Sequence, residues 1–247
     1  MRIAIISDIH ANLEALERVL EDIQARQASR ILCLGDSIGY GPEPEAVLQR
    51  LRRERIPQVQ GNHERAVIVP KDRCWFNPNA REALVITEKL LSDDSRAWLP
   101  GLPLTFIQPG LYGVHGCPPE SVRRYLFSLS DRQLRQVFQG LENRVCFVGH
   151  THLLHHVTFD GEQLHRQDLT EGQYWLDPAC QHIVNVGSVG QPRDGDSRSK
   201  YVLWEPDHRL LTVRCVHYDI AVTAKAILAL GLPEQYARVL WQNSPTT

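Results

Sequence analysis

Short apolar runs and amphipathic segments alternate at the start of the chain. Residues 3–6 and 30–34 are apolar runs typical of strands buried on both faces. Apolar residues recur at helical spacing over 13–23, and residues 44–53 predict a second helix. Residues 57–60 predict a third, short strand. This alternation predicts βαβ units with a parallel sheet and right-handed crossovers.

The pattern changes between residues 64 and 112. An irregular stretch there is followed by a helical segment over 80–91 and by several prolines, which predicts a helical cap or insert beside the sheet. Strand-like segments then return at close spacing, which indicates hairpins and a second, mixed or antiparallel sheet. These segments are residues 111–115, 145–148, 152–158, 182–186, 200–205 and 210–218.

The C-terminal part of the chain, residues 219–247, predicts a tail of two short helices separated at Gly231-Leu232-Pro233. We therefore expect one α/β domain over residues 1–247. Within it, two sheets pack together and helices cover the outside.

The composition is that of an ordinary globular chain. It has 247 residues, of which 43% are hydrophobic, and its 27 basic and 29 acidic side chains leave a net charge of −2. A chain of this length buries enough apolar surface to fold without disulfides or a structural metal. Binding to long nucleic acids through a broad basic face requires an excess of Lys and Arg, so we expect no such partner.

The six cysteines are spread too widely to form a motif. The closest two, Cys117 and Cys146, are 29 positions apart, so no C-x-x-C pair exists. The apolar run at residues 3–6 is too short for a signal peptide, and no stretch reaches the ~18 apolar residues of a membrane helix. We therefore expect free thiols, a cytoplasmic location and no membrane partner. A homo-oligomer is compatible with this sequence.

Polar residues suited to catalysis or metal binding follow five of the apolar runs. Because loops converge at the carboxyl ends of strands in open α/β sheets, we expect these residues to meet at one edge. Glycines beside several of them allow sharp turns and a close approach to a ligand. The five groups are Asp8 and His10; Gly35 and Asp36; Gly61, Asn62, His63 and Glu64; His115 and Gly116; and Gly149, His150, Thr151 and His152.

These side chains suit a pair of divalent cations. Carboxylates together with imidazoles favour Mn, Fe, Co or Zn over Ca or Mg alone. Asp8 and His10, two apart on an extended segment, are expected to point the same way, as are His150 and His152. An aspartate such as Asp36 has two oxygens and can bridge two ions. Ions ~3.5–4 Å apart can share a hydroxide and stabilise both the attacking and the leaving oxygen of a phosphoryl displacement.

Each of these motifs also has a structural interpretation when taken alone. An Asp-x-His dipeptide occurs by chance in many proteins, and a strand with one solvated face readily gives His-x-His. Gly-Asp after a strand is often only a turn. The coincidence of all five groups at strand ends, from Asp8 to His152, favours the chemical interpretation.

This ordered set of motifs resembles that of the calcineurin-like metallophosphoesterase superfamily. The resemblance extends from the first strand to about residue 205, and the ordered set is highly specific. Residues 35–42 and 185–193 are similar to those of a small prokaryotic phosphodiesterase-type branch, often named by analogy with diadenosine tetraphosphatase and serine/threonine phosphatases. The resemblance implies a four-layer α/β/β/α sandwich of two mixed sheets flanked by helices, in agreement with the two-sheet prediction.

The resemblance further implies two metal ions with one shared ligand. One ion would be bound by Asp8, His10, Asp36 and His152, and the other by Asp36, Asn62, His115 and His150. Manganese is the expected metal, with iron, zinc, cobalt, nickel and magnesium as alternatives. The nucleophile would be a hydroxide that bridges the two ions.

The same resemblance implies a catalytic role for His63. This histidine would not bind metal; it would protonate the leaving oxygen or stabilise charge on the phosphoryl group. Glu64 would orient the ring of His63 through its other nitrogen.

One part of the sequence departs from the protein-phosphatase relatives. They carry an Asp-Arg pair where this chain has Gly39-Tyr40, so their phosphate-binding arginine is absent. Arg193, in a glycine-rich loop, is a candidate replacement, and a solvated loop arginine is an equally good interpretation. We expect Tyr40 and Arg193 to bind substrate.

Two further groups of residues have open interpretations. Trp75 and Phe76 are either core anchors or an apolar wall for a substrate base. Arg123, Arg124 and Tyr125 could line the same cleft, although anchoring in the core or at a dimer contact is favoured.

We therefore predict a metal-dependent phosphoesterase that acts on phosphodiesters in a small phosphoester or nucleotide substrate. The alternatives are a phosphomonoesterase or protein phosphatase, a dinucleoside-polyphosphate hydrolase, and a catalytically silent scaffold of the same fold. The scaffold is disfavoured because it would have no chemical need for His63 together with every expected ligand.

Overall fold

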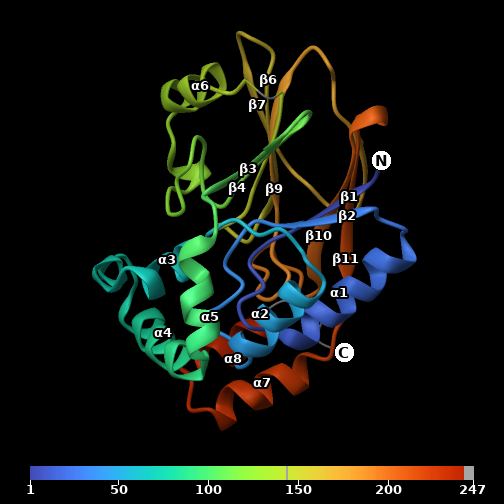
Figure 1. Cartoon of the computed structure of the whole chain (residues 1–247). Helices are drawn as coiled ribbons and strands as arrows, with labels where there is room; N and C mark the ends of the chain where they lie inside the picture. The colour runs from blue at the N-terminus through green and yellow to red at the C-terminus, as the bar shows by residue number, and fades with distance from the viewer. Residues whose placement is uncertain (143, 242–247) are drawn as a thin grey trace.

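Two β-sheets pack face to face at the centre of the molecule (Figure 1). The computed structural model describes residues 1–142 and 144–241. One sheet runs in the order β2 (Arg30–Cys33), β1 (Ile3–Ile6), β10 (Ser199–Glu205), β11 (Leu210–Val216) and β8 (Gly172–Trp175). The other runs in the order β3 (Thr105–Gln108), β4 (Leu111–Val114), β5 (Val145–Val148), β9 (Gln181–Val186), β6 (Leu154–Phe159) and β7 (Leu164–Asp168).

Both sheets contain parallel and antiparallel pairs. In the first sheet β1 pairs parallel with β2 but antiparallel with β10. In the second, β5 lies parallel between β4 and β9, and the remaining pairs are antiparallel. The parallel β1–β2 pair confirms the predicted βαβ unit, and the two mixed sheets confirm the predicted fold class. β10 joins the first sheet antiparallel to β1 from far along the chain.

Alternation along β1 divides its side chains between two cores. Ile3 and Ile5 point into the apolar core between the sheets. Ala4 and Ile6 point the other way, into a core shared with α1 (Leu13–Ala25) and α2 (Pro44–Arg53). The strand is therefore buried on both faces, as its apolar sequence predicts.

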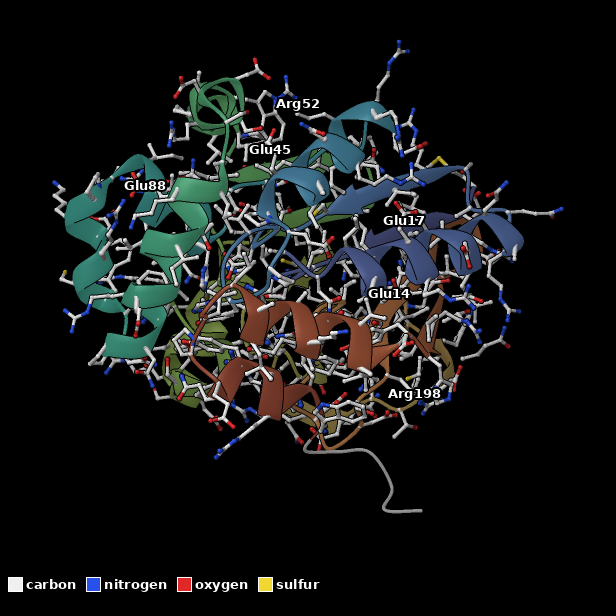
Figure 2. All side chains as sticks on the ribbon, turned by 90° about the horizontal axis from the view of Figure 1, so that it is seen from below. Glu14, Glu17, Glu45, Arg52, Glu88 and Arg198 are labelled. Carbon is white, nitrogen blue, oxygen red and sulfur yellow. The ribbon has the colours of Figure 1, made fainter. Side chains whose placement is uncertain are left out.

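Helices cover the outer face of each sheet. α1 and α2 lie on the sheet that contains β1, and α6 (Asp131–Gln139) lies on the other, through Leu134 and Phe138. Glu14 and Glu17 are on the polar side of α1, away from the apolar face that it buries (Figure 2). The layers are thus helix, sheet, sheet and helix, which confirms the predicted α/β/β/α sandwich.

Residues 64–112 are largely helical and also include β3. This segment contains α3 (Asn62–Ile68), α4 (Pro78–Leu90) and α5 (Asp93–Trp98), and it packs on α2. Glu45 of α2 accepts hydrogen bonds from Ser92 and Ser95 at the start of α5, and Arg52 pairs with Asp94 at 2.6 Å (Figure 2). Short 3₁₀ segments are η1 (Pro70–Trp75), η2 (Leu99–Gly101), η3 (Leu126–Ser128) and η4 (Pro206–His208).

The C-terminal tail forms α7 (Ile220–Ala229) and α8 (Gln235–Trp241), which pack against α4. The last part of the predicted tail, residues 242–247, lies outside the described residues. No helix in the described ranges is long and apolar enough to span a bilayer. All six cysteines are free, as expected.

The predicted strands and helices are present with boundaries shifted by at most two residues, with one exception. Residues 57–60 form no strand. They make one isolated β-bridge, between Gln58 and Cys33, and the N–H of Gln60 donates to the carbonyl oxygen of Pro103 instead of continuing the pairing. The sequence pattern did not predict α3, α5, α6, β3, β7 or β8.

Candidate metal centre

Five of the predicted ligands lie in loops with left-handed backbone. The φ angle is 53° at Asp8, 49° at His10, 52° at Asp36, 68° at His150 and 61° at His152. The extended geometry expected for the Asp8 and His150 motifs is therefore wrong, although all five side chains reach one region. Residues other than glycine seldom adopt this conformation, and such strain is concentrated at functional sites.

Hydrogen bonds between the loops position these side chains. The N–H groups of Asp8 and His10 donate to the carbonyl oxygens of Gly35 and Asp36, at 3.0 and 2.9 Å. The N–H of His150 donates to Oδ2 of Asp8 at 2.9 Å. These bonds bring the carboxyl ends of β1, β2 and β5 together.

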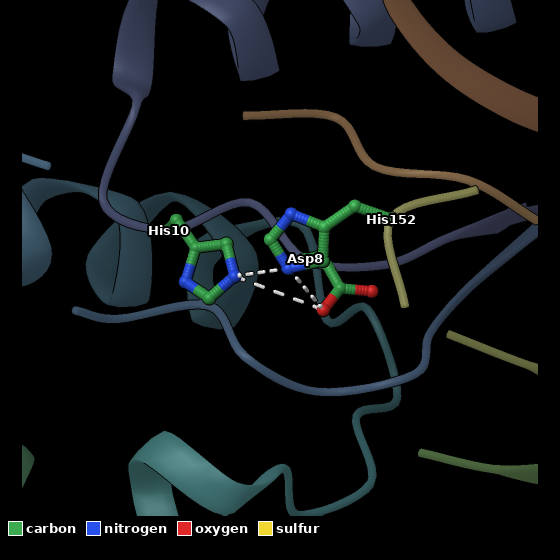
Figure 3. A group of neighbouring side chains, drawn as sticks. All are labelled: Asp8, His10 and His152. Atoms are coloured by element: carbon green, nitrogen blue, oxygen red, sulfur yellow. Dashed lines mark hydrogen bonds and ion pairs between the residues drawn. The ribbon is translucent and has the colours of Figure 1, made fainter. Parts of the chain in front are cut away.

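Asp8, His10 and His152 form the first cluster of side chains (Figure 3). Nε2 of His10 and Nε2 of His152 are 3.0 Å apart, and Oδ1 of Asp8 lies 3.3 Å from the second and 3.7 Å from the first. All three residues are buried, and Oδ1 of Asp8 has no hydrogen-bond partner among the described residues. Burial would raise the pKa of Asp8, but His152 lowers it below its usual range.

The second cluster surrounds Nε2 of His115. Oδ2 of Asp36 and Nδ1 of His150 both lie 3.2 Å from this nitrogen, and Oδ1 of Asn62 lies 3.0 Å from it. Oδ2 of Asp36 is also 3.9 Å from Nε2 of His10 in the first cluster. The Asp36 carboxylate therefore lies between the two clusters.

Four of the histidines share one arrangement. In each, one ring nitrogen contacts a backbone carbonyl, which only accepts, so that nitrogen carries the proton and the other directs its lone pair into the centre. The carbonyls are those of Ile38 for His10, Leu34 for His115, Gln191 for His152 and Arg123 for His150, at 3.2, 2.8, 2.6 and 3.0 Å.

This arrangement fits a divalent cation. The unprotonated nitrogens of His10 and His152 face each other with the carboxylate of Asp8 beside them. Lone pairs brought this close repel one another, and a cation between them would relieve the repulsion. Imidazole and carboxylate donors are also the ligands that first-row divalent metals prefer.

Burial and neighbouring charges together control protonation in the centre. It lowers the pKa of His63 to about 4 and that of His150 to about 3, and it holds His10 well below its usual range. Burial would also lower the pKa of His115, but the Asp36 carboxylate raises it to about 9. Burial would raise the pKa of Asp36, but His115 and His63 lower it. Neutral imidazoles and ionised carboxylates are the forms that bind metals. The lowered pKa values leave His10 and His150 neutral, whereas His115 would release its second proton when a metal binds.

His63 differs from the other four histidines. Its Nδ1 is buried without a hydrogen-bond partner among the described residues, and its Nε2 lies 3.9 Å from Oδ2 of Asp36. The ring packs edge-on against Tyr40 and Phe76, with centroids 4.4 and 4.9 Å away. A Cβ on Gly39 would lie 2.0 Å from Nδ1, so glycine is required there to make room for the ring.

The expected role of Glu64 is wrong. Its carboxylate accepts backbone N–H groups and does not orient the ring of His63, because residues 36–38 and Gly61 surround it at the start of α3. Oε2 accepts from Asp36 and Gly61 at 2.9 and 2.8 Å, and Oε1 accepts from Ser37 at 2.8 Å. Glu64 therefore connects the loop that carries Asp36 to the helix that begins with Asn62.

Tyr40 and Arg193 both lie beside the centre. The ring of Tyr40 packs on His10, with centroids 4.6 Å apart, and the Arg193 guanidinium lies 6.0 Å from the centroid of Tyr40. Arg193 also donates to Oε1 of Gln191 at 2.7 Å, while the carbonyl of Gln191 accepts from His152. The loop arginine is thus connected to a candidate ligand.

A cavity of 620 Å³ adjoins the second cluster, with Asn62 and His150 in its lining. Trp75, Phe76, Arg123, Arg124 and Tyr125 line it as well. The favoured expectation that the last three anchor in the core is wrong, because all three are exposed. Trp75 is 40% exposed, so of its two interpretations the cavity wall is correct and the core anchor is not.

The sequence matches the calcineurin-like phosphoesterase superfamily domain over residues 1–209. The chain belongs to this superfamily. Its two mixed sheets, outer helices and clustered Asp and His side chains agree with a metallophosphoesterase, a hydrolase acting on phosphoester bonds. The observed clusters are consistent with divalent metal binding.

Similar proteins cover at least 94% of this superfamily member. A metallophosphoesterase from Sphaerobacter thermophilus is 37% identical, with a TM-score of 0.86 and 99% of each chain covered. The uncharacterized protein MJ0912 of Methanocaldococcus jannaschii is 36% identical over 240 residues, 94% of each chain. The hypothetical protein PH1004 of Pyrococcus horikoshii, 17% identical over 99% of each chain, shares the fold with a TM-score of 0.76.

The C-terminal helices lie beyond the matched superfamily domain but contact its site. Tyr236 of α8 stacks on Tyr40, with centroids 4.6 Å apart and ring planes at 29°. The sequence pattern gave no signal for this contact, because the two tyrosines are far apart in the chain and neither belongs to a motif.

Proposed function

We propose that this protein is a phosphodiesterase whose active centre binds two divalent metal ions. The observation that carries the proposal is the arrangement of the four anchored histidines, His10, His115, His150 and His152, whose free nitrogens point inward. Two clusters that share a carboxylate are what a pair of ions requires. The superfamily match supports the same chemistry.

The seven residues of the two clusters would hold the ions, with Asp36 as the shared ligand and manganese as the first expectation. Asp8, His10 and His152 would complete one site, and Asn62, His115 and His150 the other. When bound, the ions would activate water as the nucleophile and stabilise negative charge on the phosphoryl group.

His63 would act as the general acid. Its ring lacks the carbonyl anchor of the four ligand histidines, and its Nε2 faces Asp36. The form that acts as the acid is the imidazolium, which gives its Nε2 proton to the oxygen of the leaving group and keeps the proton on Nδ1. Because burial lowers the pKa of His63 to about 4, this form is a minor one at pH 7 and becomes more abundant as the pH falls.

The surroundings of the centre favour a diester over a monoester. A phosphomonoester carries a second negative charge, which the phosphatase branch binds with the arginine of its Asp-Arg pair. This chain has Gly39-Tyr40 at those positions and lacks that arginine. Aromatic side chains at Trp75 and Phe76 leave room for an organic group on the phosphate. The free cysteines support a reducing, cytoplasmic setting for this activity.

A comparison of two substrates tests the proposal. The protein is treated with a chelator, Mn²⁺ is added back, and hydrolysis of bis-p-nitrophenyl phosphate is measured against that of p-nitrophenyl phosphate. We expect Mn²⁺ to restore diester cleavage with kcat/KM at least about tenfold above that for the monoester. The reverse preference would favour a phosphomonoesterase, and no turnover of either substrate would favour a scaffold.

A further inference from the structure

The cavity beside the second cluster combines aromatic surface with positive charge. Trp75, Phe76 and Tyr125 supply the rings, and Arg123 and Arg124 supply the charge. Among the described residues that line it there is no carboxylate. A ligand that matches this lining has a planar aromatic part and an anionic part.

Arg123 connects the cavity to the candidate metal centre. Its backbone carbonyl accepts the Nε2–H of His150 at 3.0 Å, while its guanidinium lies 4.4 Å from the centroid of the Trp75 ring. Neither Arg123 nor Arg124 forms an ion pair with any described residue. Their charges are therefore available to an anionic ligand.

Tyr125, in the lining of the cavity, packs against the candidate metal centre. Its ring stacks on His150, with centroids 4.1 Å apart and ring planes at 12°, and it also stacks on Phe127, with centroids 5.0 Å apart. A flat group bound next to Tyr125 is thus a direct neighbour of the candidate ligand His150.

We propose that this cavity binds the nucleoside part of a nucleotide phosphodiester, which makes nucleotides the substrate class of the enzyme. The inference rests on the proposed function, because it places the scissile phosphate at the metal centre. The base contacts Trp75 and Tyr125, and Arg123 and Arg124 bind a phosphate next to the scissile one.

Size and chemistry separate nucleotides from other phosphodiesters. A cavity of 620 Å³ lies within the range that encloses a ligand as large as a nucleotide. Glycerol and sugar phosphodiesters offer anionic oxygens but no aromatic surface for Trp75 and Tyr125. A nucleotide uses both the rings and the arginines.

Inhibition by two phosphates that differ only in the base tests this inference. AMP and ribose 5-phosphate are compared as inhibitors of bis-p-nitrophenyl phosphate hydrolysis. We expect AMP to inhibit at a concentration about tenfold lower, because ribose 5-phosphate lacks the stacking base. In Trp75→Ala the ratio should fall to near one. In Arg123→Gln, which keeps the backbone contact to His150, both inhibitors should bind severalfold more weakly while their ratio stays the same, because both carry the phosphate.

The matched control is Trp175→Ala, at an exposed tryptophan of β8 that does not line the cavity. This variant should keep the ratio of the unchanged protein. Equal inhibition by AMP and ribose 5-phosphate, or a preference for AMP that survives Trp75→Ala, would overturn the inference.

A second measurement separates this inference from the proposed function. AMP is titrated into chelator-treated protein while tryptophan fluorescence is recorded, so no catalysis is needed. Quenching that disappears in Trp75→Phe supports the nucleotide cavity even if no diester is hydrolysed. If the protein hydrolyses bis-p-nitrophenyl phosphate but shows no preference for AMP, the phosphodiesterase proposal stands and the nucleotide-binding inference is wrong.

Discussion

Glu64 positions Asp36: the buried Glu64 carboxylate accepts the N–H of Asp36 at 2.9 Å. The same carboxylate accepts the N–H of Gly61, which precedes the candidate ligand Asn62. Burial and the charge of Asp36 raise the pKa of Glu64 to about 7. One carboxylate thus sets the relative position of two loops that both supply the centre.

Replacement of Glu64 by glutamine should destabilise the protein and its centre together. The amide NH₂ would face backbone N–H groups that now have an acceptor, so the free energy of unfolding should fall by about 2–4 kcal/mol. Urea denaturation measures this change, and Glu17→Gln on the outer side of α1 is the control. Equal stability of the Glu64 and Glu17 variants would contradict the positioning role.

His63 should matter most for substrates with poor leaving groups. In His63→Ala, kcat for a methyl or nucleoside leaving group should fall by about 10²–10⁴, because the general acid is lost. With p-nitrophenolate, which leaves without a proton, the loss should be much smaller. An equal loss for both leaving groups, or a loss of bound Mn²⁺, would assign His63 to metal binding.

Gly39→Ala should reproduce the effect of His63→Ala on activity. The new Cβ would lie 2.0 Å from Nδ1 of His63, and the φ of +86° adds a backbone cost of about 1 kcal/mol. Gly195→Ala is a matched control, because Gly195 has the same φ and a Cβ there would meet nothing within 4 Å. Gly39→Ala should lose more stability in thermal unfolding than Gly195→Ala, because the clash with His63 adds to the backbone cost, and only Gly39→Ala should lose activity on poor leaving groups. Activity retained at Gly39→Ala would refute this steric account.

A buried histidine pair outside the centre should make stability depend on pH. Nε2 of His156 lies 3.0 Å from Nδ1 of His182, and burial lowers the pKa of His156 from 6.5 to about 4. The unfolded chain therefore binds more protons between these values, so stability is complete above pH 6.5 and is lost as pH falls toward 4. The His156 contribution is up to about 3 kcal/mol.

Urea denaturation from pH 7 to pH 4.5 measures this dependence. His156→Asn should show a shallower loss of stability than the unchanged protein over that range, because one lowered pKa has been removed. The same slope in both proteins would show that His156 does not contribute.

The sequence predicts the elements whose side chains are buried in a regular pattern. β1 is predicted with its observed bounds because it is a continuous apolar run buried on both faces, and α2 because its apolar positions repeat with the helical period. β7 was missed because most of its residues are exposed, and α6 because only Leu134 and Phe138 are buried in it. The antiparallel pairing of β10 with β1 joins the two ends of the fold, which local pattern does not reveal.

The candidate site, too, is predicted from the sequence only in part. The chemistry of Asp8, Asp36 and His115 is visible in the sequence, because each stands within three residues of the end of an apolar strand. The role of Glu64 is not visible in the sequence, because its hydrogen-bond donors are backbone N–H groups that come together only when the loops fold. The sequence did not decide whether Trp75 and Arg123 line a cavity. The two residues lie in separate segments that share no helix or strand, so no local pattern predicts their contact.

The central claim is that two ions share Asp36. Crystals of the protein soaked in Mn²⁺ and recorded near the manganese absorption edge test it directly. The account predicts two anomalous peaks, one beside Asp8, His10 and His152 and one beside Asn62, His115 and His150, with Asp36 contacting both and with at least one peak lost in Asp36→Asn. A single peak, or peaks away from these side chains, would contradict it.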